Sequence, residues 1–412
     1  MKTSHDVIVI GGGPAGATSA ILLAQAGWRV AVIEKARFPR RKVCGEFISA
    51  TTWPLLRQLG VAQTLLPMAG PPVRRVGVFA GGDTVTARLP APKHGDDAGR
   101  AIGREHLDAA LLRQAADAGA EVFQPCALTA FADRRNGYEC TCTEVDAQAG
   151  QTLRAKLIIA AHGCWECGPL PTQDLRRDAL PSDLFGFKAH FRDGALAADL
   201  MPLLAFPGGY GGMVQSDDGR LSLSCCIRRD QLERCRQRWP GIKAGAAVLA
   251  HISASTAGVA RALAGATLDG AWLAAGPLRT GARTFGNGGI FAVGNAAAEA
   301  HPVVAEGISM AIQSSTLLCR QLLAQPGIRL DTADAGAIRV RVRDGYEKAW
   351  RSNFSRRLRF AAAYAQLFMR PLPTRIAMAV LERFPLLLTE GARWSGKSAP
   401  LREAPRLRAA RS

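Results

Sequence analysis

The sequence contains no long apolar run, which excludes a protein with spanning helices. No stretch of about 18 or more uncharged apolar residues occurs among its 412 residues, and a spanning helix needs about 20. The first residues, MKTSHDVIVIGGG, have too short an apolar run for a secretory signal and lack a small-residue cleavage site. We therefore expect a cytoplasmic protein, attached to a membrane, if at all, only peripherally at its inner face.

Acidic residues are also scarce, with 34 Asp and Glu against 52 Lys and Arg, which leaves a net charge of +18. Residues 320–412 carry much of this excess, with 19 basic against 7 acidic side chains. Such a surface attracts nucleic acid, anionic membrane or acidic substrates. No helix-turn-helix, zinc-finger or aromatic RNA-binding signature is present, so we expect no nucleic acid partner. A solvated basic face and a peripheral contact with anionic membrane remain open.

The ten cysteines lack the spacing of a metal site or a disulfide framework. Without an export signal, they are expected to be reduced thiols. Cys164-x-x-Cys167 has no second CxxC and no ligand-spaced histidine pair beside it. We interpret it as a thiol pair in a loop or in the core, and we expect no metal.

Residues 6–35, DVIVIGGGPAGATSAILLAQAGWRVAVIEK, have the pattern of a strand, a glycine turn, a helix and a second strand. Gly11 permits the tight turn, Gly13 lets the backbone approach a pyrophosphate, and Gly16 lets the helix pack on the strand. Pro14 and Ala15 open the helix, whose free N–H groups and positive dipole end favour phosphate. The sequence therefore predicts a dinucleotide site here.

Glu34 ends the second strand, 18 residues after Gly16, and is followed by Lys35. Its carboxylate can accept hydrogen bonds from a ribose diol and disfavours a 2′-phosphate, so the bound adenosine is not that of NADP. The whole pattern, Gly-x-Gly-x-x-Gly-x3-Ala-x6-Gly, resembles FAD-binding proteins more than dinucleotide-binding dehydrogenases.

Residues 38–46, FPRRKVCGE, resemble the P-R-x-K-x-C-G-E segment of the geranylgeranyl reductase group of flavoproteins. That group belongs with the para-hydroxybenzoate hydroxylase-like monooxygenases and the flavin halogenases. The resemblance implies that Arg40 and Lys42 neutralise the pyrophosphate. It also implies that Cys44, Gly45 and Glu46 pass close to the isoalloxazine.

Two further segments carry the same resemblance. Residues 103–111, GREHLDAAL, are similar to the family's R-x-x-L-D-x-x-L helix, in which the arginine, here Arg104, contacts FAD. IFAVGNAAAEAHPVVAEGISMA, residues 290–311, resembles the block G-D-A-A-x6-P-x-x-G-x-G-I-x-x-A that holds the ribityl chain and the pyrimidine edge. This implies that the cofactor also contacts Gly294, Asn295, Pro302, Gly307 and Ile308.

Three positions depart from the family pattern. Asn295 replaces the expected Asp, although its amide oxygen can still accept a hydrogen bond from a ribityl hydroxyl. Ala305 replaces a glycine and crowds the flavin side. In residues 157–167, His162 stands where the family has Asp, and the Ser and Arg of A-D-G-x-x-S-x-V-R are absent. The mode of nicotinamide binding is therefore left open.

Residues 185–226 alternate apolar side chains with turn glycines, and Ser216 to Gly219 form an expected hairpin turn. We expect this region to be a substrate sheet. Tyr210 lies in a partial match to the geranylgeranyl reductase segment G-Y-x-W-x-F-P. His301, Tyr210 and Glu46 are the catalytic candidates, whereas Lys188 and His190, like Tyr210, also suit ordinary strand positions. The halogenase signature W-x-W-x-I-P is absent.

The expected fold is α/β, a Rossmann-like FAD-binding domain of the glutathione reductase type with an inserted β-sheet substrate domain and a helical C-terminal region. The FAD-binding domain is assigned to residues 1–75, 100–170 and 275–325, and the substrate domain to 76–99 and 171–274. Helices are expected over 326–394, with one ending before Pro371 and Pro373 and the next starting at Arg375. A disordered basic tail is expected over 395–412.

Three functions remain open. The first is an FAD monooxygenase that hydroxylates or epoxidises an apolar phenolic, polyketide or lipid-like substrate through a flavin C4a-hydroperoxide, with NADH or NADPH as electron donor. The second is a reductase that saturates an isoprenoid C=C bond, which the Cys-Gly-Glu segment favours. The third is a non-catalytic lipid carrier on the same fold. In every case the expected partner is a small hydrophobic molecule.

Overall fold

The computed structural model describes residues 4–90, 98–144, 150–164, 167–173, 178–329, 334–397 and 401. Its N-terminal part has the predicted order, with β1 (Ser4–Ile10), α1 (Pro14–Gln25) and β2 (Val30–Ile33). The apolar, largely β-branched residues of both strands are buried, as in parallel sheets that are covered on both faces. Gly27 follows the end of α1 with a φ of 77°, a conformation that suits a helix-terminating glycine.

β1 lies near the centre of an eight-stranded sheet whose main order is β17–β18–β10–β1–β2–β7. β10, β1, β2 and β7 run parallel, as do β10 and β18, and an antiparallel hairpin of β8 and β9 extends from β10. These strands are β7 (Glu121–Phe123), β8 (Cys126–Arg134), β9 (Gly137–Glu144), β10 (Gly150–Ala160), β17 (Gly286–Asn287) and β18 (Ile290–Ala292).

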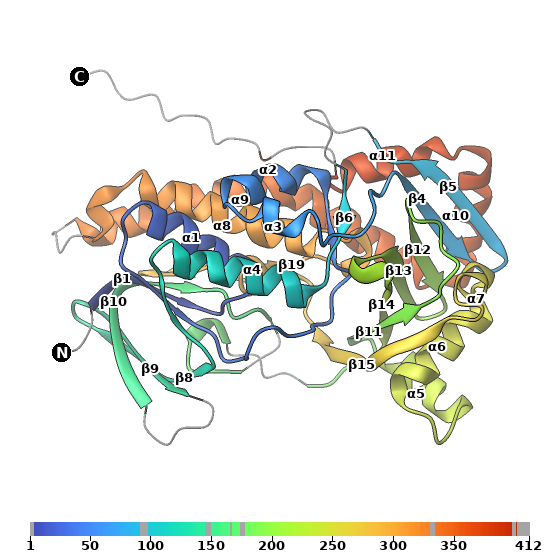
Figure 1. Cartoon of the computed structure of the whole chain (residues 1–412), viewed down its shortest axis with the longest axis horizontal. Coiled ribbons are helices and arrows are strands. Elements are labelled where there is room, and N and C mark those ends of the chain that lie inside the picture. Colours follow the sequence, from blue (N-terminus) through green and yellow to red (C-terminus); the bar gives the residue numbers. More distant parts are fainter. Residues whose placement is uncertain are drawn as a thin grey trace.

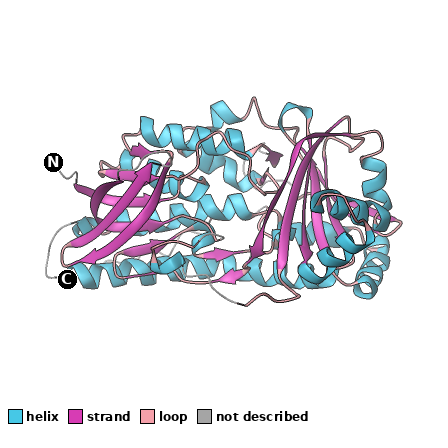
Figure 2. Ribbon diagram, turned by 90° about the horizontal axis from the view of Figure 1, so that it is seen from below, coloured by secondary structure: helices cyan, strands magenta, loops and turns pink. Residues whose placement is uncertain are grey.

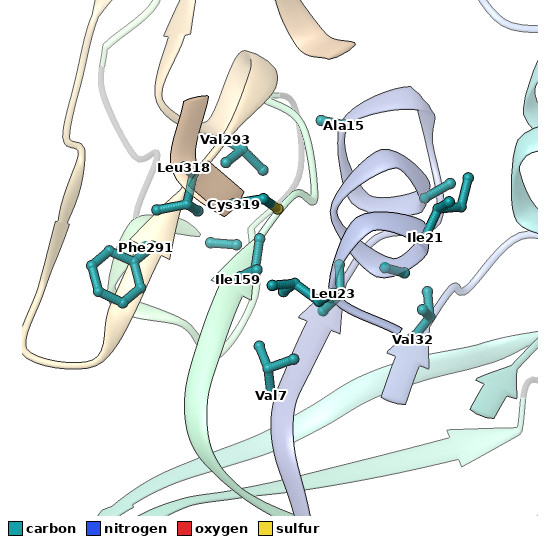
Figure 3. Close-up of a cluster of buried hydrophobic side chains, with 14 of the residues drawn as sticks. Val7, Ala15, Ile21, Leu23, Val32, Ile159, Phe291, Val293, Leu318 and Cys319 are labelled. Atoms are coloured by element: carbon teal, nitrogen blue, oxygen red, sulfur yellow. The ribbon is translucent and has the colours of Figure 1, made fainter. Parts of the chain in front are cut away.

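Helices α1 and α8 (Gly307–Leu323) cover this sheet, and α4 (Arg104–Asp117) packs beside α1. Figure 3 shows Val7, Ile159 and Phe291 of the strands facing Leu23 of α1 and Leu318 of α8. Burying such side chains contributes about 1.5–3 kcal/mol each. This packing fixes the glycine turn of α1 beside the start of α8.

A second, seven-stranded sheet has the order β15–β11–β14–β13–β12–β4–β5. All neighbours are antiparallel except β12 and β4, which run parallel. Figure 2 shows the two sheets separated along the long axis of the molecule. The strands are β4 (Arg75–Ala80), β5 (Asp83–Arg88), β11 (Leu184–Arg192), β12 (Leu200–Phe206), β13 (Gly209–Gln215), β14 (Leu221–Arg228) and β15 (Thr267–Leu278).

Three helices pack on this second sheet around a separate apolar cluster that includes Phe187 and Leu223. They are α5 (Arg229–Arg238), α6 (Ala244–Ser255) and α7 (Ala257–Ala262). The elements before α8 also include two short strand pairs and two short helices. The pairs are β3 (Phe47–Ile48) with β6 (Arg100–Ala101) and β16 (Gly281–Ala282) with β19 (Ala298–Glu299). The helices are α2 (Trp53–Gln58) and α3 (Ala62–Leu65).

The C-terminal helices are α9 (Ala335–Phe368), α10 (Pro371–Arg383) and α11 (Leu386–Trp394). α9 contacts α8 of the first unit and β12 and β13 of the second, and Figure 1 shows α10 and α11 beside β4 and β5. α10 begins at Pro371, not at Arg375 as predicted. The reason is that a proline in the first turn needs no intrahelical N–H partner, so it starts this helix as well as ending the previous one.

The predicted α/β architecture, with a second sheet and a helical C-terminal region, is confirmed. Packing extends beyond Trp394, because Ser395 and Lys397 are buried, whereas 398–400 and 402–412 lie outside the described residues. All ten cysteines are free thiols. In the described part of the chain, every helix is too short or too polar to cross a bilayer.

Candidate functional site

One cavity of about 700 Å³ brings together nearly all the site residues predicted from the sequence. Its wall extends from the glycine turn after β1 to the seven-stranded sheet and to the segment before α8. Gly13 and Asn295, which are far apart in the sequence, both line it. Gly16 and Gly294 do not line it, and each is packed closely against α1 or the glycine turn, with Gly11 beside Gly16 and Ala15 beside Gly294.

The backbone of the glycine turn leaves no room for a side chain at two of its positions. A Cβ on Gly16 would lie 1.8 Å from the carbonyl oxygen of Gly11, and a Cβ on Gly11, at a φ of 105°, would lie 2.5 Å from that of Ala161. A Cβ on Gly13 would meet nothing nearer than Arg104 Nη2 at 3.8 Å. Gly11 and Gly16 are therefore required for packing, whereas Gly13 leaves the turn open toward the cavity.

The N-terminus of α1 faces this opening without a side-chain cap. Pro14 is in the first turn, and no acidic residue lies there to occupy the free N–H groups. Pro14 and Ala15 line the cavity. Uncapped N–H groups and the positive end of the helix dipole form an anion site.

Glu34 is buried beside the turn, at the end of β2. Its Oε2 accepts a hydrogen bond from the Gly12 N–H at 2.7 Å, and its Oε1 accepts one from the Ala36 N–H at 2.8 Å. Each carboxylate oxygen has two lone-pair sites, so both oxygens can still accept from a ribose diol. Lys35 follows at the cavity wall.

Three cationic side chains, Arg40, Lys42 and Arg104, line the cavity close to the turn. Arg104 donates two hydrogen bonds of 2.7 Å to Asp108 on the next turn of α4, which fixes its guanidinium. Burial, together with the charges of Arg104 and Arg40, lowers the pKa of Lys42. A bound pyrophosphate would offset this mutual repulsion, so the set fits a dianion.

The opposite part of the cavity is formed after β18. Gly294 has a φ of 58°, and a Cβ there would lie 2.8 Å from the Cβ of Ala15. Asn295 points its Nδ2 to Glu299 Oε1 at 3.2 Å and to Cys164 Sγ at 3.7 Å. Cys44 and Gly45 line the same cavity.

Glu299 is a site residue that the sequence analysis missed. It lines the cavity beside Asn295, and burial raises its pKa although Cys164 and Arg283 act in the opposite direction. A carboxyl group is thus present near the expected Asp position, four residues later in the chain. The sequence contains a signal for it, because Glu299 is the only acidic residue between Gly294 and His301.

α8 begins at the cavity wall. Pro302, Ala305, Gly307 and Ile308 line the cavity, and no acidic residue lies in the first turn of the helix. Ala305, the departure from the family glycine, has a φ of 51°. This N-terminus is therefore a second dipole end that faces the cavity.

Two catalytic candidates are in contact. The Tyr210 hydroxyl on β13 and His301 Nδ1 are 3.0 Å apart, and His301 Nε2 is 3.2 Å from the Thr280 hydroxyl. Burial raises the pKa of Tyr210 well above its ordinary value and lowers that of His301. The pair is therefore a neutral phenol beside a neutral imidazole.

The third candidate, Glu46, lines the cavity but is paired inside the protein. It contacts Lys188 Nζ through Oε1, and its Oε2 lies 2.9 Å from His190 Nε2. Burial raises the pKa of Glu46, but the charge of Lys188 and the hydrogen bond from His190 outweigh it and hold the pKa far below the usual range. Lys188 and His190, both on β11, are thus members of a buried charge cluster.

His162, which stands at the family Asp position, also lines the cavity, and its Nε2 is 2.8 Å from Thr172 Oγ1. Cys164 and Cys167 line the cavity too, and burial raises the pKa of Cys164 so that it stays a thiol. The two residues between these cysteines lie outside the described residues.

Residues 4–167 match the family model described as "FAD binding domain". A menaquinone reductase of Mycolicibacterium smegmatis is 35% identical over 164 residues, which are 40% of this chain and 38% of that protein. A tryptophan 2-halogenase of Chondromyces crocatus is 24% identical over 371 residues, 85% of this chain and 67% of that protein.

Among solved structures, a flavin-dependent brominase, Bmp2, superposes with a TM-score of 0.74 at 18% identity and covers 96% of this chain and 94% of its own. At that identity the likeness concerns the fold. The match to the menaquinone reductase spans less than two fifths of that protein's length. The predicted relationship to this superfamily of FAD-dependent flavoproteins is confirmed.

Proposed function

We propose that the chain is an FAD-dependent oxidoreductase, because residues 4–167 match the family model of an FAD binding domain. Within that class we propose a monooxygenase that acts on an apolar phenolic, polyketide or lipid-like substrate. One observation carries the proposal. The cavity of about 700 Å³ that is cationic beside the glycine turn also holds the part-buried Tyr210–His301 pair among apolar side chains.

The described residues fit FAD. The uncapped α1 N-terminus and the three cations suit its pyrophosphate, Glu34 suits its ribose, and the α8 N-terminus suits the edge of its flavin ring. When bound and reduced, FAD would supply the electrons that activate O2 or saturate a double bond.

The substrate end of the cavity is apolar. Met201, Leu203, Met213, Val214 and Val303 line it, from β12, β13 and the segment before α8. A wall of this kind binds a greasy molecule through the hydrophobic effect and keeps water away from the reacting atoms. The Tyr210–His301 pair gives the same wall a polar group that can orient a substrate hydroxyl.

The pair can also move a proton. A neutral imidazole accepts one, and a phenol becomes more reactive toward an oxygen electrophile when its own proton is removed. We assign His301 as the proton acceptor, with Tyr210 as the group that positions it or relays the proton. Glu46, held ionised by Lys188 and His190, is assigned a positioning role for the segment of residues 44–46.

The reaction balances with an external reductant. One atom of O2 enters the substrate and the other leaves as water. NADH or NADPH supplies a hydride, which is two electrons and one proton, and the second proton is taken from solvent. The nicotinamide donor is part of the proposal, because His162 replaces the family Asp at the segment linked to NAD(P)H.

A second candidate is reduction of an isoprenoid C=C bond. The similarity to a menaquinone reductase over 164 residues favours it, as does the position of Cys44 and Gly45 at the cavity wall. Tyr210, whose pKa is raised by burial, would then be the proton donor. Halogenation has the tryptophan 2-halogenase similarity in its favour, but the sequence lacks W-x-W-x-I-P.

The first experiment is anaerobic titration of the purified protein with NADH and with NADPH, followed by air, with an alkylphenol or an isoprenoid diphosphate present. We expect a yellow protein, alkylphenol-dependent O2 uptake, and one labelled oxygen atom from ¹⁸O₂ in the product. Saturation of the isoprenoid without O2 uptake would favour the reductase. A strict chloride or bromide requirement would favour a halogenase, and a colourless protein a lipid carrier.

The second experiment tests the proton acceptor. His301→Gln should lower kcat on the alkylphenol by about 10²-fold or more and remove the loss of rate below the His301 pKa, which lies under its usual value. The matched control is His251→Gln, a buried histidine that lies outside the cavity and contacts the Pro207 carbonyl oxygen. An unchanged pH profile in His301→Gln would refute the assignment.

A further inference from the structure

A concentrated apolar surface lies on the C-terminal helices, away from the cavity. Of the twelve large apolar side chains that are exposed in the described part of the chain, seven lie between residues 372 and 394. We name this set the α10–α11 apolar face. It consists of Leu372, Ile376, Val380, Phe384, Leu386, Leu387 and Trp394.

The face follows the geometry of the helix. Leu372, Ile376 and Val380 are spaced by four residues, so they lie along one side of α10, and Phe384 follows as the residue that ends the helix. Ile376 is 60% exposed and Phe384 is 58% exposed. An aligned apolar stripe of this kind marks an interaction surface, in contrast to the single exposed apolar residues found on any protein.

The other side of α10 is packed in the protein. Thr374 and Met378 are buried, and Met378 belongs to an apolar cluster that also contains Tyr210 and Val303. The helix is therefore anchored on its inner side, and its outer side is left for a partner. The same cluster separates the α10–α11 apolar face from the substrate end of the cavity.

Basic side chains surround the face. Arg375 and Arg383 are exposed on α10, and Arg370 is exposed just before it. The Arg383 guanidinium lies 5.8 Å from the centre of the Phe384 ring, so its charge lies beside the apolar stripe. Of the two acids on these helices, Glu390 is paired with Arg393 at 2.5 Å, which leaves an excess of positive charge.

We propose that the α10–α11 apolar face docks this protein on an anionic lipid bilayer, with its side chains at the acyl boundary and the arginines at the headgroups. An apolar stripe bordered by arginine is the chemistry of an interfacial helix. In the described residues no helix can span a bilayer, so the protein would lie on the surface. A symmetric contact between two copies fits less well, because it would bring like-charged arginines together.

Docking would place the apolar cluster of Met378, Val303 and Tyr210 between the lipid and the cavity. A greasy substrate dissolved in the bilayer would then have an apolar route to the site. Only this delivery step rests on the proposed function. The docking itself needs no turnover, and its test is a binding measurement, so failure of one proposal is distinguishable from failure of the other.

The test is co-sedimentation of the full-length, flavin-loaded protein with vesicles of phosphatidylcholine alone or mixed with phosphatidylglycerol. We expect binding to the anionic vesicles that weakens with added salt, and little binding to the neutral ones. Ile376→Gln/Phe384→Gln should lower the partition coefficient by about 10²-fold. Arg375→Gln and Arg383→Gln should each lower it about fivefold.

The matched control is Ile242→Gln/Leu268→Gln, which removes two side chains of similar exposure outside the C-terminal helices. This variant should bind vesicles like the wild type, and near-ultraviolet circular dichroism verifies the fold of each variant. Equal vesicle binding by Ile376→Gln/Phe384→Gln would overturn the proposal. A second result would also overturn it: a wild-type protein that binds no lipid and is a dimer by light scattering, while the Ile376→Gln/Phe384→Gln variant is a monomer. The face would then be the contact with a second copy.

Discussion

The buried pairing of Glu46 with Lys188 gives the sharpest prediction for stability. Both side chains are almost fully buried, at 1% exposure each, and Glu46 also contacts His190 at 2.9 Å. Glu46→Gln preserves the size of the side chain and a hydrogen bond to His190 but removes the negative charge. The Lys188 ammonium would remain in the interior without its counter-ion.

The magnitude follows from that burial. Removing one partner of a buried ion pair costs about 3–5 kcal/mol of unfolding free energy, whereas replacing both partners by apolar groups costs far less. We expect Glu46→Gln to show the larger loss and Glu46→Gln/Lys188→Met to recover most of it. Asp199→Asn is the matched surface control, because the pair of Asp199 with Arg75 is more than a third exposed and should contribute less than about 1 kcal/mol.

The dependence on pH has a definite sign. The pKa of Glu46 is lowered in the folded protein, so its carboxylate stabilises the fold at any pH above its unfolded pKa of about 4.3. That contribution is lost as the pH falls through the lower, folded pKa. The difference between wild type and Glu46→Gln should therefore be constant from about pH 5 to 7 and shrink below about pH 4.

The assay is urea unfolding of the flavin-loaded proteins, followed by tryptophan fluorescence, across that pH range. Two results would refute the reasoning. One is a Glu46→Gln protein as stable as the wild type at pH 7. The other is a double variant that loses as much as both single variants together, since independent residues add and coupled residues do not.

Three further predictions concern the cofactor end. Gly16→Ala should abolish flavin binding, measured by absorbance of the purified protein, because the new Cβ would lie 1.8 Å from the Gly11 oxygen. The control is Gly27→Ala, whose Cβ meets nothing within 4 Å. It should keep the flavin and lower the free energy of unfolding by about 1–2 kcal/mol. Lys397→Met should lower the Tm by several degrees and Lys397→Arg by less, because Lys397 contacts the fully buried Glu306 carboxylate at 3.1 Å. Removal of FAD should lower the Tm of the wild type, and added FAD should restore it in proportion to its concentration.

The cofactor end could be predicted from the sequence because its signals are local. Gly11, Gly13, Gly16 and Glu34 lie within one strand–helix–strand unit, and each of these residue types has a single backbone or hydrogen-bonding reason. The packing of the α/β fold follows from the same segment. The start of α8 at Gly307 was also predictable, since the small residues before it resemble a known cofactor-binding block.

The substrate end depends on pairs that are distant in the sequence. Nothing local indicates that Tyr210 lies 3.0 Å from His301, or that Lys188 and His190 turn toward Glu46. These contacts arise because two sheets and the segment before α8 meet around one cavity. Glu299 was missed for a related reason, since its alignment with the family Asp is shifted by four residues and only the fold brings it beside Asn295.

The cation cluster also links the cofactor to the fold. Lys42 is half-buried with Arg40 and Arg104 nearby, and Asp108 holds the Arg104 guanidinium through two hydrogen bonds of 2.7 Å. Buried like charges are unfavourable unless an anion joins them. The unfavourable free energy of keeping these like charges close together is therefore offset when a pyrophosphate binds. The segment that carries Lys42 continues directly into Glu46, so the same binding event would also fix the wall beside the substrate sheet.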